Sequence, residues 1–120
     1  MILSFSNKYR YFIYRLPCDM RKGFDGLSGM VQSAFSMNAL NGDVFIFFNR
    51  PKNRVKILHW QGDGFIIYNK RLEKGTFELP ENNFTGCSLE ITPHQLQFIL
   101  DGITLSSIKH RLRYKLKNAS

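Results

Sequence analysis

Basic residues occupy every second position from residue 50 to residue 56, and two more follow in adjacent positions further along. They are Arg50, Lys52, Arg54, Lys56, Lys70 and Arg71. Lysine and arginine neutralise the phosphates of nucleic acids, and these contacts supply most of the affinity that is independent of base sequence. Charge of this kind also protects the edge of a sheet from pairing with another chain. Both interpretations fit the spacing.

The stretch DMRKGFDGLSGM, residues 19–30, combines three glycines with the cations Arg21 and Lys22. Glycines beside a cation can form a loop that holds a phosphate, usually after a strand and before a helix. Here, however, the glycines fall inside a helical pattern, which disfavours a phosphate loop. A close-fitting partner, DNA or protein, would explain two cations at the start of a helix.

That helical pattern predicts an amphipathic helix over residues 20–35, with Asp19 as its N-cap. Gly23 falls on the apolar side of this helix, where a missing side chain would allow close contact with a sheet. Gly29 falls outside the apolar side, and glycine costs about 1 kcal/mol relative to alanine inside a helix. Close packing therefore explains Gly23 better than it explains Gly29.

No residues show the spacing of a catalytic site. The nine acidic residues form no paired carboxylates of the kind that a metal-dependent nuclease requires. Nucleophile-elbow, HExxH and P-loop motifs are absent from the sequence. The two cysteines and three histidines lack zinc-ligand spacing, so we expect two free thiols. The sequence therefore predicts a protein that is not an enzyme and that has no cofactor and no metal.

Composition predicts a folded, basic protein. The 120 residues include 43% hydrophobic residues and eleven phenylalanines, which favours a folded chain over a disordered one. Seventeen basic residues against nine acidic ones give a net charge of +8, which favours a polyanionic partner. No run of apolar residues is long enough to cross a membrane, and the first residues lack a signal-peptide core. We therefore expect a cytoplasmic protein with no membrane contact.

Three strand-like segments, 43–49, 54–60 and 65–72, are joined by short turns and predict an antiparallel meander. Four-residue connections would place Phe48 opposite Val55 and Trp60 opposite Phe65. One face of this meander then mixes aromatic and basic residues: Phe45, Phe47, Arg54, Lys56, Leu58, Trp60, Phe65 and Ile67. This face could be buried beneath a helix at 92–100, or it could be open for base stacking or for a protein partner through Phe45, Phe47 and Trp60.

Further elements complete a predicted single α+β domain over residues 1–107, with four or five antiparallel strands. Residues 9–16 and 87–91 have strand character, and a helix is expected at 93–100 with Thr92 as its cap. Residues 108–120 form a basic tail that alternates like a strand, and we expect an edge strand or a flexible arm. Its cations, which we expect to contact nucleic acid, are Lys109, Arg111, Arg113, Lys115 and Lys117.

Three motifs, DMRKGFDGL, RVKILHWQGDGF and KRLEKGTF, resemble those of the small accessory proteins, often called TnpB, of bacterial insertion-sequence family sixty-six. The resemblance runs from Pro17 to about Gly102 and ends in LQFILDGI, whereas the tail departs from the family's form. It implies a role in transposition beside a separate, larger transposase, and it supplies no catalytic residues.

These observations predict a non-catalytic accessory factor in DNA transposition. Its expected partners are DNA, at element ends or without sequence preference, and the larger transposase. Its expected nucleic-acid contacts are Arg21, Lys22, the six cations at 50–56 and 70–71, and the tail. The alternative is a protein adaptor that docks on the transposase, or on a second copy of itself, through Phe45, Phe47 and Trp60.

Overall fold

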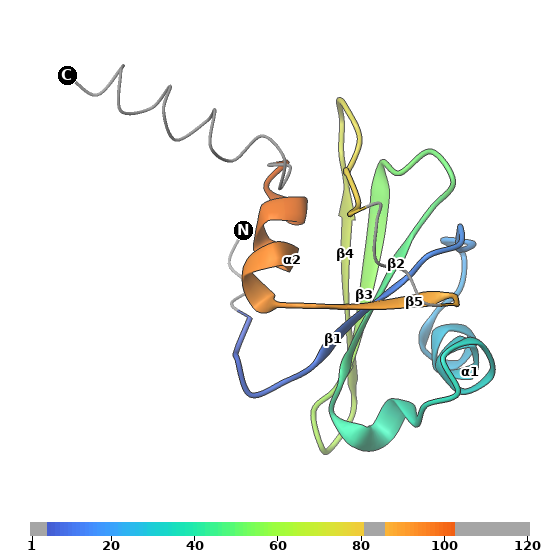
Figure 1. The fold of residues 1–120 in the computed structure, drawn as a ribbon. Helices are drawn as coiled ribbons and strands as arrows, with labels where there is room; N and C mark the ends of the chain where they lie inside the picture. The colour runs from blue at the N-terminus through green and yellow to red at the C-terminus, as the bar shows by residue number, and fades with distance from the viewer. Residues whose placement is uncertain (1–4, 81–85, 103–120) are drawn as a thin grey trace.

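The chain forms a five-stranded sheet with one helix on each face, in a computed structural model that describes residues 5–80 and 86–102 (Figure 1). The strand order is β4-β3-β2-β1-β5. Along the chain the elements are β1 (Tyr11–Tyr14), α1 (Phe24–Ala34), the 3-10 turn η1 (Ala39–Asn41), β2 (Val44–Phe48), β3 (Arg54–Trp60), β4 (Phe65–Arg71), β5 (Ser88–Ile91) and α2 (Pro93–Leu100). The predicted α+β class is confirmed.

Strands β2, β3 and β4 form the predicted antiparallel meander in the predicted register. Phe48 lies opposite Val55, and Trp60 lies opposite Phe65. The β3–β4 turn closes with a hydrogen bond of 2.9 Å from the Gln61 amide to the Gly64 carbonyl. Short turns leave little freedom in register, and a slip by one residue would reverse the buried face of the strand.

The sheet is mixed, because β1 is parallel to β2 and antiparallel to β5. Tyr11 lies opposite Val44 on one side and opposite Ile91 on the other. The prediction of a purely antiparallel sheet is wrong for the β1–β2 pair. Parallel neighbours need a crossover connection, and the chain makes that crossover through α1.

Each face of the sheet packs on a different helix. The α2 face buries Val44, Ile46, Phe48, Val55 and Ile57 with Leu96, Ile99 and Leu100 of the helix. The α1 face buries Phe45, Phe47 and Leu58 with Leu27, Val31 and Phe35. Phe45, Phe47 and Leu58 of the mixed aromatic and basic face are therefore buried, but the prediction that the 92–100 helix covers this face is wrong. The crossover from β1 to β2 places α1 there instead.

Helix α1 begins later than predicted. Gly23 is its N-cap and provides no side-chain cap, so the expected start at residue 20 is wrong. The Asp19 carboxylate does not cap this helix, because it accepts hydrogen bonds from the amide and the guanidinium of Arg21. The ideal Cβ position at Gly23 has no atom within 4 Å, so the predicted close contact between Gly23 and the sheet is also wrong.

Two glycines inside α1 are expected to respond differently to alanine. The space around the missing Cβ of Gly29 is open, so Gly29→Ala is expected to stabilise the fold by about 0.5–1 kcal/mol. At Gly26 an added Cβ would lie 3.1 Å from the Cβ of Lys22, so that side chain would have to move. Urea unfolding of both variants measures the difference. Equal gains would show that Lys22 moves without cost.

Helix α2 has the predicted start. The Thr92 hydroxyl accepts a hydrogen bond from the Gln95 amide, and the Gln95 side chain accepts one from the Thr92 amide. This reciprocal pair is a capping box.

The two cysteines are free, as predicted, and the Cys87 thiol donates a hydrogen bond of 2.7 Å to the Ala34 carbonyl. In the described ranges no helix is long and apolar enough to cross a membrane.

Candidate nucleic-acid interface

The predicted cations of the meander lie at one end of the sheet, where β2 ends, β3 begins and β4 ends. We call this region the basic end and define it as Arg50, Lys52, Arg54, Lys56, Lys70 and Arg71. The register of the meander brings them together, because Phe48 pairs with Val55 while Arg54 pairs with Arg71. Their common location is thus a consequence of the short turns.

The β2–β3 turn is held by backbone and amide groups. The Asn49 side chain accepts hydrogen bonds of 3.0 Å from the amides of Asn53 and Arg54. The Lys52 carbonyl accepts a hydrogen bond of 2.6 Å from the amide of Phe77, whose ring lies 5.6 Å from that of Phe48. This turn is therefore fastened to the core, and its cations project from a well-defined backbone.

Two cations of the basic end bind carbonyl groups on opposite faces. The Lys56 ammonium donates a hydrogen bond of 2.8 Å to the Lys22 carbonyl, on the α1 face. The Lys70 ammonium donates one of 3.1 Å to the Leu100 carbonyl, at the C-terminal end of α2. A cation at a helix C-terminus interacts favourably with the unpaired carbonyl groups there. Lys56 and Lys70 thus contribute to the fold, and a single flat ligand could not contact both from one face.

The segment that carries Arg21 and Lys22 lies beside the basic end. The Cys18 amide donates a hydrogen bond of 2.8 Å to the Phe48 carbonyl, and Lys22 is bound by Lys56 as described above. Arg21 forms an ion pair of 2.7 Å with Asp19, and its hydrogen bonds lower the pKa of that carboxyl to about 2. The sequence identified these residues, but their position next to β2 and β3 depends on contacts between distant parts of the chain.

The three predicted aromatic contacts have different environments. Phe45 and Phe47 are completely buried, each at 0% exposure, so neither is available to a partner in this structure. Trp60 is half-buried and packs edge to face on Phe65, with ring centroids 5.0 Å apart. Of the three predicted partner contacts, Trp60 alone retains partial exposure. The tail cations Lys109, Arg111, Arg113, Lys115 and Lys117 lie outside the described residues.

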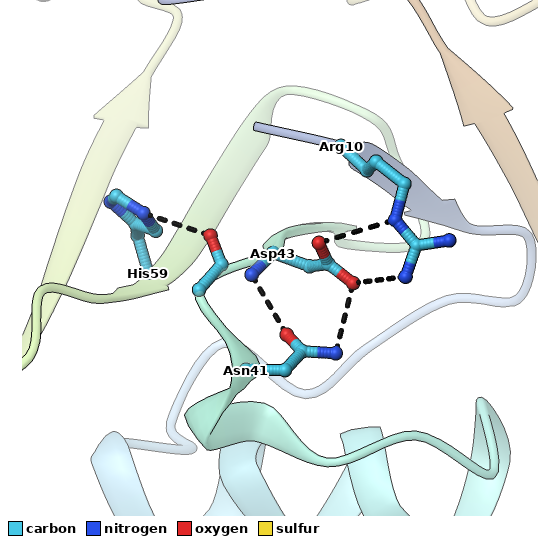
Figure 2. A network of polar contacts seen from close by, with 5 residues as sticks. Arg10, Asn41, Asp43 and His59 are labelled. Atoms are coloured by element: carbon cyan, nitrogen blue, oxygen red, sulfur yellow. Dashed lines mark hydrogen bonds and ion pairs between the residues drawn. The ribbon is translucent and has the colours of Figure 1, made fainter. Parts of the chain in front are cut away.

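A polar network at the opposite end of the sheet was not identified from the sequence. Figure 2 shows the Asp43 carboxylate between the Arg10 guanidinium, at 2.9 Å, and the Asn41 side-chain amide, also at 2.9 Å. Next to it, the His59 ring nitrogen Nε2 lies 3.1 Å from the Gly42 carbonyl oxygen. Burial lowers the pKa of His59. These groups satisfy one another, which indicates a structural role.

No group of three or more histidine, cysteine, aspartate or glutamate side chains could hold a metal ion among residues 5–80 and 86–102. Within the same ranges there are three ion pairs, and two of them, Arg21–Asp19 and Arg71–Glu73, lie at or beside the basic end. Arg50, Lys52 and Arg54 form no ion pair with a described residue. The basic end therefore provides positive charge and N–H donors that can bind an anion.

One family model matches most of the chain, and two uncharacterized proteins are similar to it over most of their length. Residues 9–110 match the family model described as "IS66 Orf2 like protein". The uncharacterized protein y4hO of Sinorhizobium fredii is 36% identical over 102 residues, which cover 85% of this chain and 87% of that protein. The uncharacterized protein y4jC of the same organism is 28% identical over 106 residues, covering 88% and 89%. No solved structure matches the chain.

Proposed function

Because the chain belongs to the IS66 Orf2-like family, a family associated with transposition, we propose that it is a non-catalytic accessory factor that binds DNA. The observation that carries this proposal is the excess of cations at the basic end. Both ion pairs in that region are solvent-exposed, and exposed pairs contribute little to stability. The cations are therefore available to a polyanion at small cost.

Phosphate contacts dominate this mode of binding, so affinity depends weakly on base sequence and strongly on salt. The basic end is formed by two strand ends and a fixed turn, which suits the backbone of a duplex better than the edges of bases. The larger transposase of the same element would act on DNA held in this way. A cytoplasmic location and self-association stay predictions.

A salt series tests the proposal. Fluorescence anisotropy would measure binding of the full chain to a random duplex and to an element-end duplex, at 50 and 200 mM salt. Six phosphate contacts would weaken binding by about 10³-fold across this range. We expect a similar loss for both duplexes, with and without the transposase. A flat salt response, or no binding at 50 mM salt, would contradict DNA binding.

A matched pair of charge reversals tests whether DNA contacts the basic end. Arg50→Glu changes an exposed cation of the basic end, whereas Lys8→Glu changes an exposed cation near the other end of the sheet. We expect Arg50→Glu to weaken DNA binding and to reduce the slope of log affinity against log salt concentration by about one phosphate contact. Lys8→Glu should bind DNA about as tightly as the unmodified protein. Equal losses would indicate attraction by net charge alone.

The alternative adaptor function rests on Trp60 and is an outcome of the same assay. Trp60→Ala would then disrupt assembly with the transposase and leave DNA affinity unchanged. Loss of DNA affinity in this variant, with assembly intact, would instead favour a stacking contact with DNA.

A further inference from the structure

Two arginines of the basic end face each other across the β3–β4 pair. Arg54 is the register partner of Arg71. The Leu72 amide donates a hydrogen bond of 2.7 Å to the Asn53 carbonyl. Asn53 and Leu72 are therefore a hydrogen-bonded pair, and such pairs alternate with non-hydrogen-bonded pairs along antiparallel strands. Arg54 and Arg71 therefore form a non-hydrogen-bonded pair, the type in which side chains approach most closely. Like charges placed directly opposite each other destabilise a sheet.

The described residues provide little compensation for this repulsion. Arg71 bonds to Glu73 at 3.1 Å, but the two side chains are 65% and 83% exposed, so the pair is weak. Arg54 has no ion pair with a described residue, and its buried Nε has no hydrogen-bond acceptor there. A buried donor without an acceptor is costly and uncommon in folded proteins.

The neighbouring side chain on the same face is another cation, so it adds positive charge beside Arg54 and offers no acceptor. Lys56 follows two residues later on β3, so it projects to the same side of the sheet, and its ammonium is occupied by the Lys22 carbonyl. The register thus places two arginines opposite each other across β3 and β4, and the Nε of Arg54 lacks a hydrogen-bond acceptor among the described residues.

We propose that Arg54 and Arg71 together form a seat for a single phosphate group of the nucleic-acid backbone. This inference rests on the proposed function and deepens it by naming the ligand group and the residues that hold it. Phosphate oxygens accept paired hydrogen bonds from the planar guanidinium fork, and a bound anion removes the repulsion between the two side chains. The remaining cations of the basic end attract DNA without holding one particular phosphate.

Inorganic phosphate tests the seat without DNA. The arginine Nε–H signals of the full chain would be followed by NMR as phosphate is added. We expect those of Arg54 and Arg71 to shift together along one saturating curve, while Arg10, bound to Asp43, and the exposed Arg15 shift weakly and without saturation. Equal responses of Arg15 and Arg54, or no saturation, would overturn the proposal.

Substitutions then test whether DNA uses the same seat. Arg54→Gln and Arg71→Gln are each expected to weaken binding about tenfold, and the double variant is expected to lose little more, because both arginines hold one phosphate. Arg50→Gln, the matched control, should add its full effect to either variant. Additive losses for Arg54→Gln and Arg71→Gln would overturn the shared seat.

Arg54→Lys keeps the charge but removes the fork, so it should lose the saturable phosphate response while it stays folded. An unchanged phosphate response in Arg54→Lys would overturn the seat. Failure of the seat and failure of the proposed function give different results. Salt-sensitive DNA binding with additive losses rejects the seat alone, whereas saturable phosphate binding without DNA binding rejects the proposed function.

Discussion

Replacing Phe47 with alanine is expected to destabilise the fold by about 3–5 kcal/mol, the range for a buried phenylalanine. Phe47 is completely buried, and its ring lies 6.0 Å from those of both Tyr14 and Phe35. Domains of this size are commonly stable by only about 5–15 kcal/mol, so this loss would remove a large part of the free energy of unfolding. Urea unfolding followed by Trp60 fluorescence and circular dichroism measures the loss.

A matched control separates packing from partner contact. Phe24 is the same residue type at 50% exposure, and Phe24→Ala is expected to change stability by less than about 0.5 kcal/mol. A Phe47→Ala variant that kept its stability and lost transposase binding would restore Phe47 as a partner contact.

The second large loss of stability is expected in the polar network around Asp43, at the end of the sheet opposite the basic end. Asp43→Ala should cost about 2–3 kcal/mol, because a nearly buried carboxylate that accepts charge-assisted hydrogen bonds would be lost. The Arg10 side chain is 58% exposed and can return to water, which keeps the loss below that of a fully buried pair. Thermal and urea unfolding of the variant give the value.

The position of Asp43 explains why a single carboxylate matters. It joins the start of β2 to Arg10, which precedes β1, beside the hydrogen bond of 2.8 Å from the Val44 amide to the Arg10 carbonyl. No tight turn sets the register of this parallel pair, so side chains contribute to it. Asp63→Ala, in the exposed β3–β4 turn, is the matched control and should be nearly neutral. Equal losses at both positions would contradict this role.

The meander could be predicted from sequence because residues close together in the chain determine it. Short turns set the pairing of β2, β3 and β4, and side-chain alternation then assigned each residue to a face. The same register places Arg54 opposite Arg71, whereas the burial of the Arg54 Nε depends on the folded structure.

Other features depend on contacts between distant segments. Asp19 could cap a helix or pair with Arg21, and the local sequence permits both. The helix that covers Phe45 and Phe47 depends on the crossover after β1, which no periodicity reveals. Likewise, nothing near Lys56 or Lys70 in the sequence indicates that their ammonium groups bind the carbonyls of Lys22 and Leu100.

The place of β1 in the sheet has a consequence for synthesis in the cell. This strand leaves the ribosome before its two neighbours, β2 and β5, and β5 is the last strand among residues 5–80 and 86–102. The meander can form from nearby residues, while β1 has to wait for a partner on each side. Assembly of the sheet therefore completes only after residue 91 has emerged, and pairings this distant in sequence form slowly. A chain that ends before β5 would leave β1 without a neighbour on the edge that β5 occupies.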